Sequence, residues 1–190
     1  MIEIENIFKY LQLGFTHVIP LGYDHILFIL CLFFLNSKPK TVAIQCAVFT
    51  LAHSISMGLT ACGVIIPNSN FIELLIALSI LYTAIENIFT TDNNPFRLIV
   101  VFGFGLIHGM GFAKALQEVG IPKENFIASL MSFNVGVELG QMTIILAAYF
   151  CISRHFSHKI WYKQRIVYPL CSAIGCVALY WTIERFLMTS

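Results

Sequence analysis

Five apolar segments of this chain carry histidine, acidic or amide side chains away from their ends. The first contains the stretch HVIPLGYDH, which places His17, Asp24 and His25 in or beside a hydrophobic run. The later segments contain His53, Glu86 with Asn87, His108, and Asn134 with Glu138 and Gln141. Ionisable groups inside a membrane are costly and are usually functional. Divalent first-row metals accept imidazole nitrogens and carboxylate oxygens as donors, so the pattern predicts metal or proton chemistry inside a membrane.

The primary candidate metal ligands combine three histidines with two acids: Asp24, His25, His53, His108 and Glu138. The secondary candidates are His17, Glu86, Asn87, Asn134 and Gln141. Neighbours on a helix point about 100° apart, so Asp24 and His25 can face one point only where the backbone is distorted, as a break at Pro20 and Gly22 would allow. Alternatively, Asp24 accepts a hydrogen bond from a histidine and fixes its tautomer for metal binding.

Two of these histidines lie in similar motifs. Phe49–Ser56 and Phe104–Gly111 share the pattern Phe-x-x-x-His-small-x-small, and an acid-bearing segment follows each. This favours a parallel duplication, which is common in transporters. Two GxxxG spacings, at Gly105 and Gly109 and at Gly136 and Gly140, are typical of close helix packing. We expect them to bring the fourth and fifth spans together and to fix His108 against Glu138.

The composition is that of an integral membrane protein with one domain, 1–190. Of its 190 residues 58% are hydrophobic and 11% charged, whereas soluble domains carry roughly 25% charged residues. We predict an all-α, polytopic transmembrane helix bundle of about six helices, with the first span kinked at Pro20 and Gly22 or preceded by a short helix. The predicted spans are about 16–36, 41–63, 71–91, 98–116, 126–152 and 166–188.

The distribution of basic residues predicts the orientation. Seven lie on one face (Lys38, Lys40, Arg97, Arg154, Lys159, Lys163, Arg165) and four on the other (Lys9, Lys114, Lys123, Arg185). Because basic loops stay in the cytoplasm, the first face should be cytoplasmic and both termini outside. We interpret His155 and His158 as solvated loop histidines. The net charge of +1 predicts no nucleic-acid partner.

These motifs resemble the HupE/UreJ family of small bacterial membrane proteins, in particular its second branch. The resemblance lies in LGYDHILF (Leu21–Phe28), FTLAHSIS (Phe49–Ser56), ELLIALSILYTAIEN ending at Glu86 and Asn87, FGLIHGMGFA (Phe104–Ala113) and FNVGVELGQ (Phe133–Gln141). It implies a nickel or cobalt permease, in the bacterial inner membrane, that supplies metal for hydrogenase or urease maturation. The His-x5-Asp-His signature of the better-studied branch corresponds to His17, Asp24 and His25, here with six intervening residues.

The leading hypothesis is a divalent transition-metal transporter for nickel or cobalt, with zinc as a further candidate metal. One alternative is an intramembrane metal-dependent hydrolase, in which Glu86 or Glu138 would act as a general base, although the chain lacks an HExxH motif. The other is an accessory subunit that binds metal without transporting it. Expected partners are the lipid bilayer and the metal ion, with a homo-oligomer or an accessory subunit left open.

Overall fold

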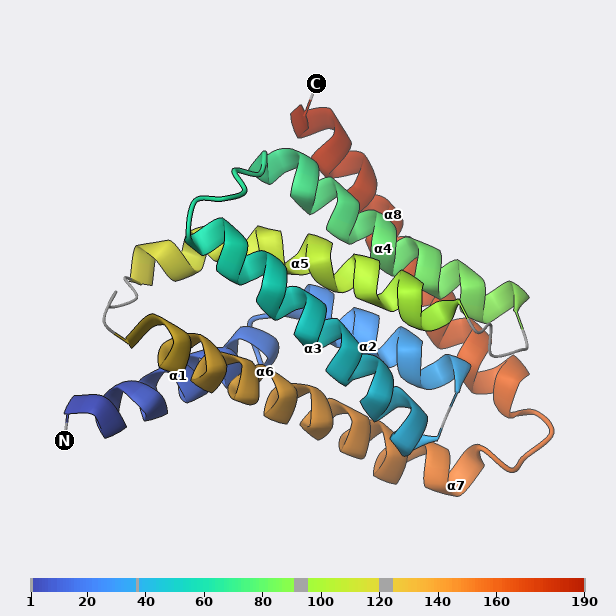
Figure 1. The fold of residues 1–190 in the computed structure, drawn as a ribbon. Coiled ribbons are helices and arrows are strands. Elements are labelled where there is room, and N and C mark those ends of the chain that lie inside the picture. Colours follow the sequence, from blue (N-terminus) through green and yellow to red (C-terminus); the bar gives the residue numbers. More distant parts are fainter. Residues whose placement is uncertain (1, 37, 91–95, 120–124, 190) are drawn as a thin grey trace.

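The structure is a computed structural model that describes residues 2–36, 38–90, 96–119 and 125–189. Within these ranges it leaves the side chains of 2–3, 113–119 and 189 undescribed. The described residues form helices joined by turns and contain no strand, which confirms the prediction of an all-α bundle (Figure 1). The elements in chain order are α1 Ile2–Val18, α2 Tyr23–Leu35, α3 Pro39–Ala61, α4 Ser69–Phe89, α5 Arg97–Val119, α6 Phe126–Ala148, η2 Tyr149–Ser153, α7 Arg154–Phe156, η3 Lys163–Val167 and α8 Tyr168–Thr189.

The helices that could cross a membrane follow the predicted spans, with two differences. Four described stretches are long and apolar enough on their own: Pro39–Ala61, Ser69–Phe89, Phe126–Phe156 and Lys163–Met188. Ile4–Val18 and Tyr23–Leu35 pass the same test as a pair and meet at an angle of 67°. Arg97–Phe112, in the predicted fourth span, is a shorter apolar helix. By length and composition the described residues thus hold four candidate spans, or five if the bent pair is one span, and the predicted fourth span, 98–116, falls on the shorter helix.

The break predicted at Pro20 and Gly22 is present between α1 and α2. The Ile19–Pro20 peptide bond is cis, and a Cβ atom on Gly22 would collide with the carbonyl oxygen of His17. The predicted first span, 16–36, covers the end of α1, the break and α2, whereas α1 itself begins at Ile2 and is a helix of 17 residues. Glu5 and Lys9 lower the hydropathy of this segment without preventing its helix from packing in the bundle.

The two GxxxG motifs do pack closely, but against other helices than expected. A Cβ atom on Gly105 would collide with Phe49 of α3, and one on Gly109 would collide with His53 of the same helix. Gly136 of α6 meets the carbonyl oxygen of Leu11 in α1 in the same way. Figure 1 shows α1 beside the first half of α6. The prediction that α5 and α6 pair through these glycines is therefore wrong, because each small face is filled by another helix.

Helices α4 and α8 run antiparallel beside each other (Figure 1). The side chain of Asn70 donates to the carbonyl oxygen of Met188 at 3.4 Å, and Arg185 Nη1 donates to that of Glu73 at 2.7 Å. The start of α4 and the end of α8 therefore lie at the same end of the bundle.

The basic residues used for the orientation have mixed environments. Arg97, which we counted as a loop cation, is 4% exposed and lies 2.9 Å from a carboxylate oxygen of Glu86. Lys123 and the side chain of Lys114 lie outside the described residues. His155 and His158 are exposed, as predicted for solvated histidines. The assignment of both termini to the outside stays a prediction.

Candidate metal centre

Four histidines from four different helices form a cluster, with His25 in contact with the other three. His17 lies in the last turn of α1, His25 in the first turn of α2, and His53 and His108 lie inside α3 and α5. The ring centroid of His25 is 4.6 Å from that of His17, 5.7 Å from that of His53 and 5.3 Å from that of His108. The bend between α1 and α2 makes this possible, because it brings the end of one helix and the start of the next to the same point.

The donor atoms form two triads that share His25. In one triad they belong to His17, His25 and His53, and in the other to Asp24, His25 and His108. All donor atoms of a triad lie within 4.8 Å of one another. Zinc–nitrogen bonds are about 2.0–2.1 Å long, so two ligands of one ion are at most about 4.2 Å apart. Side-chain shifts of less than about 1 Å would bring either triad to that spacing.

Asp24 orients His25. Its Oδ1 atom lies 3.1 Å from Nδ1 of His25 and also accepts from the backbone N–H of His25 at 2.9 Å. A carboxylate only accepts, so Nδ1 carries the hydrogen and Nε2 of His25 keeps its lone pair. The positive end of the α2 dipole also favours the carboxylate in this first turn. This contact matches the alternative in which Asp24 fixes a tautomer, and Asp24 remains in a donor triad as well.

Ser79 of α4 orients His108 in the same manner. Its hydroxyl donates to the carbonyl oxygen of Ile76 at 2.7 Å, and its Oγ atom lies 3.0 Å from Nε2 of His108. A hydroxyl has a single hydrogen, so Ser79 must accept from Nε2–H. The lone pair of His108 is therefore on Nδ1, which faces away from Ser79.

Five ring nitrogens of this cluster are buried and have no hydrogen-bond partner among the described residues: His17 Nε2, His25 Nε2, His53 Nδ1, His53 Nε2 and His108 Nδ1. The tautomers of His25 and His108 given above leave lone pairs on two of these atoms, His25 Nε2 and His108 Nδ1. An unsatisfied buried polar atom costs about 1–3 kcal/mol, so a group of five requires a compensating partner. A cation or ordered water would supply it.

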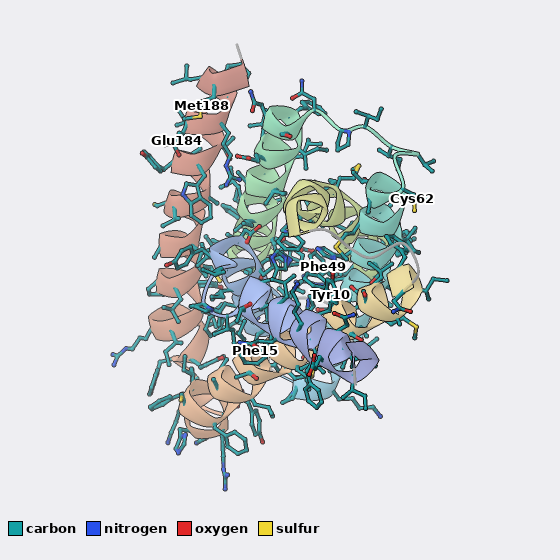
Figure 2. All side chains as sticks on the ribbon, turned by 90° about the vertical axis from the view of Figure 1, so that its left-hand side faces the viewer. Tyr10, Phe15, Phe49, Cys62, Glu184 and Met188 are labelled. Carbon is teal, nitrogen blue, oxygen red and sulfur yellow. The ribbon has the colours of Figure 1, made fainter. Side chains whose placement is uncertain are left out.

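The residues present fit a divalent ion, because neutral imidazole and carboxylate are its usual donors. Phe49 closes one side of the cluster, with its ring centroid 5.7 Å from that of His25 and 5.1 Å from that of His108. Figure 2 shows Phe49 in the interior of the bundle, with Cys62 and Glu184 at its periphery. This apolar wall keeps water from that side of the histidines.

The comparison with protein families matches residues 2–185 to the family described as HupE / UreJ protein. The chain belongs to this family. The resemblance noted in the sequence is thereby confirmed over nearly the whole chain. Together with the apolar helices, membership makes this an integral membrane protein. No curated protein and no solved structure matches the chain.

In this HupE/UreJ protein Glu138 lies in a separate polar contact. Its carboxylate accepts from the hydroxyl of Thr50 at 2.9 Å, and the side-chain oxygen of Gln141 lies 3.2 Å from the same hydroxyl. Glu138 and Gln141 therefore share one face of α6, as their spacing predicts, and that face meets α3. The donor triads of the described chain do not include Glu138.

The remaining secondary candidates also lie in other contacts. Glu86 is paired with Arg97, as described above. Asn87 donates to the carbonyl oxygen of Cys31 at 2.6 Å and lies 3.2 Å from the sulfur of Cys171, which links α4 to α2 and α8. Asn134 donates to Leu130 of its own helix at 2.8 Å, and its Oδ1 atom is buried without a partner among the residues described.

Ser79 is not among the residues that the sequence predicts for the site. Ser79, Thr83 and Asn87 follow one another at intervals of four residues, so they lie on one face of α4, and all three are buried. A stripe of small polar residues in an otherwise apolar helix is the signal that could have identified this face as one that packs against polar groups.

Proposed function

We propose that this protein transports a divalent transition metal of the nickel or cobalt type. The cation would bind in turn or together to the two donor triads formed by His17, Asp24, His25, His53 and His108. The observation that carries the proposal is the convergence of five buried ring nitrogens, none with a hydrogen-bond partner among the described residues. A bilayer interior offers little water to such atoms, so a cation bound there would accept the lone pairs that no described protein group uses.

The association of the HupE/UreJ family with nickel and cobalt handling favours these two metals. Imidazole and carboxylate donors alone also accept zinc. Because the ion is cargo, the site must release it as well as bind it. Protonation of the histidines would weaken binding, since the ligands must be deprotonated to hold the metal.

The contacts of the acids and of Ser79 favour transport over hydrolysis. Ser79 donates its only hydrogen to Ile76 and accepts from His108, so the histidine is not a base that activates this hydroxyl. Glu86 is paired with Arg97, and Glu138 accepts from Thr50. Neither glutamate therefore has the position of a general base beside the histidines.

Metal content of the purified protein tests the proposal. Wild type, His53→Ala and His108→Ala would be incubated in turn with nickel, cobalt and zinc in detergent, with His158→Ala as a control because His158 is exposed in the segment after α7. We expect stoichiometric metal in wild type and in the control and loss of metal in the two buried variants. Equal metal content in all four would contradict the site.

Uptake into liposomes then separates transport from an accessory role. We expect metal uptake by wild type and none by His53→Ala or His108→Ala. Stoichiometric binding without uptake would instead support a subunit that binds metal but does not transport it.

A further inference from the structure

A pocket of about 320 Å³ leads from the candidate metal centre to one end of the bundle. It is lined by Asp24, His25 and His108 on the inner side and by Glu73, Trp181 and Arg185 from the ends of α4 and α8. From the outer to the inner part of the pocket the exposed fraction of the side chains falls, from 56% for Glu73 to 28% for Asp24 and 2% for His25. The pocket therefore offers carboxylates at two depths before the buried histidines.

Arg185 is held at the outer part of this pocket. Its Nε atom lies 3.8 Å from a carboxylate oxygen of Glu73, and its Nη1 atom donates to the carbonyl oxygen of the same residue. Its guanidinium carbon lies 5.5 Å from the ring centroid of Trp181, within reach of a cation–π contact. A positive charge is thus fixed beside the route that leads to His25 and His108, next to the carboxylate of Glu73.

We propose that this pocket is the access route for a hydrated divalent cation, that Glu73 is its first ligand, and that Arg185 is the counter-charge that the cation must displace. The proposal rests on the transport function proposed above and names residues outside the donor triads. Six waters occupy about 180 Å³ at about 30 Å³ each, so the pocket has room for a cation that keeps its hydration shell. Asp24 is then the next carboxylate on the way to the histidines.

The charges of Glu73 and Arg185 at the outer end of the pocket should control the rate at which a cation enters. A cleft lined by one sign of charge raises association rates by about 10- to 1,000-fold, and salt weakens this effect. Glu73→Gln removes the attracting carboxylate and leaves Arg185 to repel cations. Arg185→Gln removes the repelling charge, and Arg185→Lys keeps it. Glu184→Gln is the matched control. Glu184 lies next to Arg185 on α8 but does not line the pocket, and Figure 2 shows it at the outside of the bundle.

The first test needs no metal. Ile76→Cys places a thiol in the pocket one turn of α4 beyond Glu73, in a chain whose exposed cysteines Cys62, Cys151 and Cys176 are replaced by serine. Its rates of reaction with cationic and anionic methanethiosulfonates of similar size are then compared. We expect the cationic reagent to react about tenfold faster than the anionic one. This ratio of rates should be smaller in Glu73→Gln and larger in Arg185→Gln. A ratio that neither substitution changes would overturn the proposal.

The second test measures nickel binding by stopped flow. We expect Glu73→Gln to bind about tenfold more slowly and Arg185→Gln faster, both with wild-type stoichiometry, and we expect added salt to reduce the differences. Arg185→Lys and Glu184→Gln should match wild type. Unchanged association rates in a protein that binds nickel overturn the access route alone. A wild type that binds no metal contradicts the proposed function and with it the assignment of this route to a metal.

Discussion

Ser79 fixes His108 in a single tautomer across the contact between α4 and α5. The hydroxyl hydrogen of Ser79 is used by Ile76, so the 3.0 Å contact with Nε2 of His108 requires the hydrogen to be on the ring. Asp24 does the same for His25 from the other ring nitrogen. In both cases the hydrogen-bond partner leaves the lone pair on the ring nitrogen that is buried without a partner among the described residues, as partners of metal-binding histidines do.

Replacement of Ser79 by alanine should weaken metal binding without removing a donor atom. His108 would lose its partner and could take the other tautomer, and loss of such partners typically lowers metal affinity about 10- to 100-fold. Binding isotherms with nickel measure the effect. Thr83→Val is the control, because Thr83 is a buried residue of the same helix face whose hydroxyl donates to the carbonyl oxygen of Ser79 in its own helix at 2.8 Å. Equal losses in both variants would point to a general packing defect.

Metal binding should weaken as the pH falls. A protonated ring nitrogen has no lone pair for a metal, so the histidines must be neutral when the ion binds. Each proton that the metal displaces lowers the affinity by up to about tenfold per pH unit. Isotherms between about pH 8 and about pH 5.5 would reveal this slope. An affinity that is constant over the range would contradict this expectation and would mean that the site keeps its histidines neutral down to about pH 5.5.

The sequence predicts the helices well and their partners poorly. Apolar runs, Pro20 and Gly22 locate the spans and the break between α1 and α2, because these signals are local in the chain. The glycine motifs predict that α5 and α6 each have a small face, which is correct. They do not predict which helix fills it, since that depends on the arrangement of the whole bundle. For this reason the close contacts of Gly109 with His53 and of Gly136 with Leu11 were unexpected.

The same distinction applies to the candidate metal centre. The residue types and their depth in the spans predict His25, His53 and His108 as site residues, because a histidine inside a membrane needs a polar neighbour. The position of Glu138 could not be predicted from its spacing, which fixes a face of α6 but not the helix opposite. The opposite helix offers Thr50 at 2.9 Å. Ser79 went unnoticed because a single hydroxyl in an apolar run usually bonds to its own backbone.

Gly109→Ala should destabilise the protein and disturb the metal centre together. The added Cβ atom would collide with the carbonyl oxygen of His53 and with Ser56, so α5 must move away from α3. Overpacking of this kind costs about 1–3 kcal/mol, and it would shift His53 relative to the other donors. Thermal unfolding in detergent and nickel content measure the two effects.

Gly103→Ala is the matched control for that substitution. Gly103 lies on the same helix, and a Cβ atom there would have no neighbouring atom within 4 Å. Because alanine favours a helix by roughly 0.5–1 kcal/mol over glycine, this variant should be at least as stable as wild type. Similar destabilisation by both substitutions would show that the contact with His53 is not the cause.

Asp24 and Glu138, the two acids among the primary candidates predicted from the sequence, can be compared by the same chemical change. Asp24→Asn removes a charge that touches His25 and belongs to a donor triad, so we expect a loss of nickel affinity of about 10- to 100-fold. Glu138→Gln alters a carboxylate that accepts from Thr50, and an amide oxygen can accept the same hydrogen bond. We expect its affinity to stay within about threefold of wild type, well below the effect of a lost partner. A large loss in Glu138→Gln would instead mean that this side chain reaches the metal when the ion is bound, as its position on α6 led us to expect from the sequence.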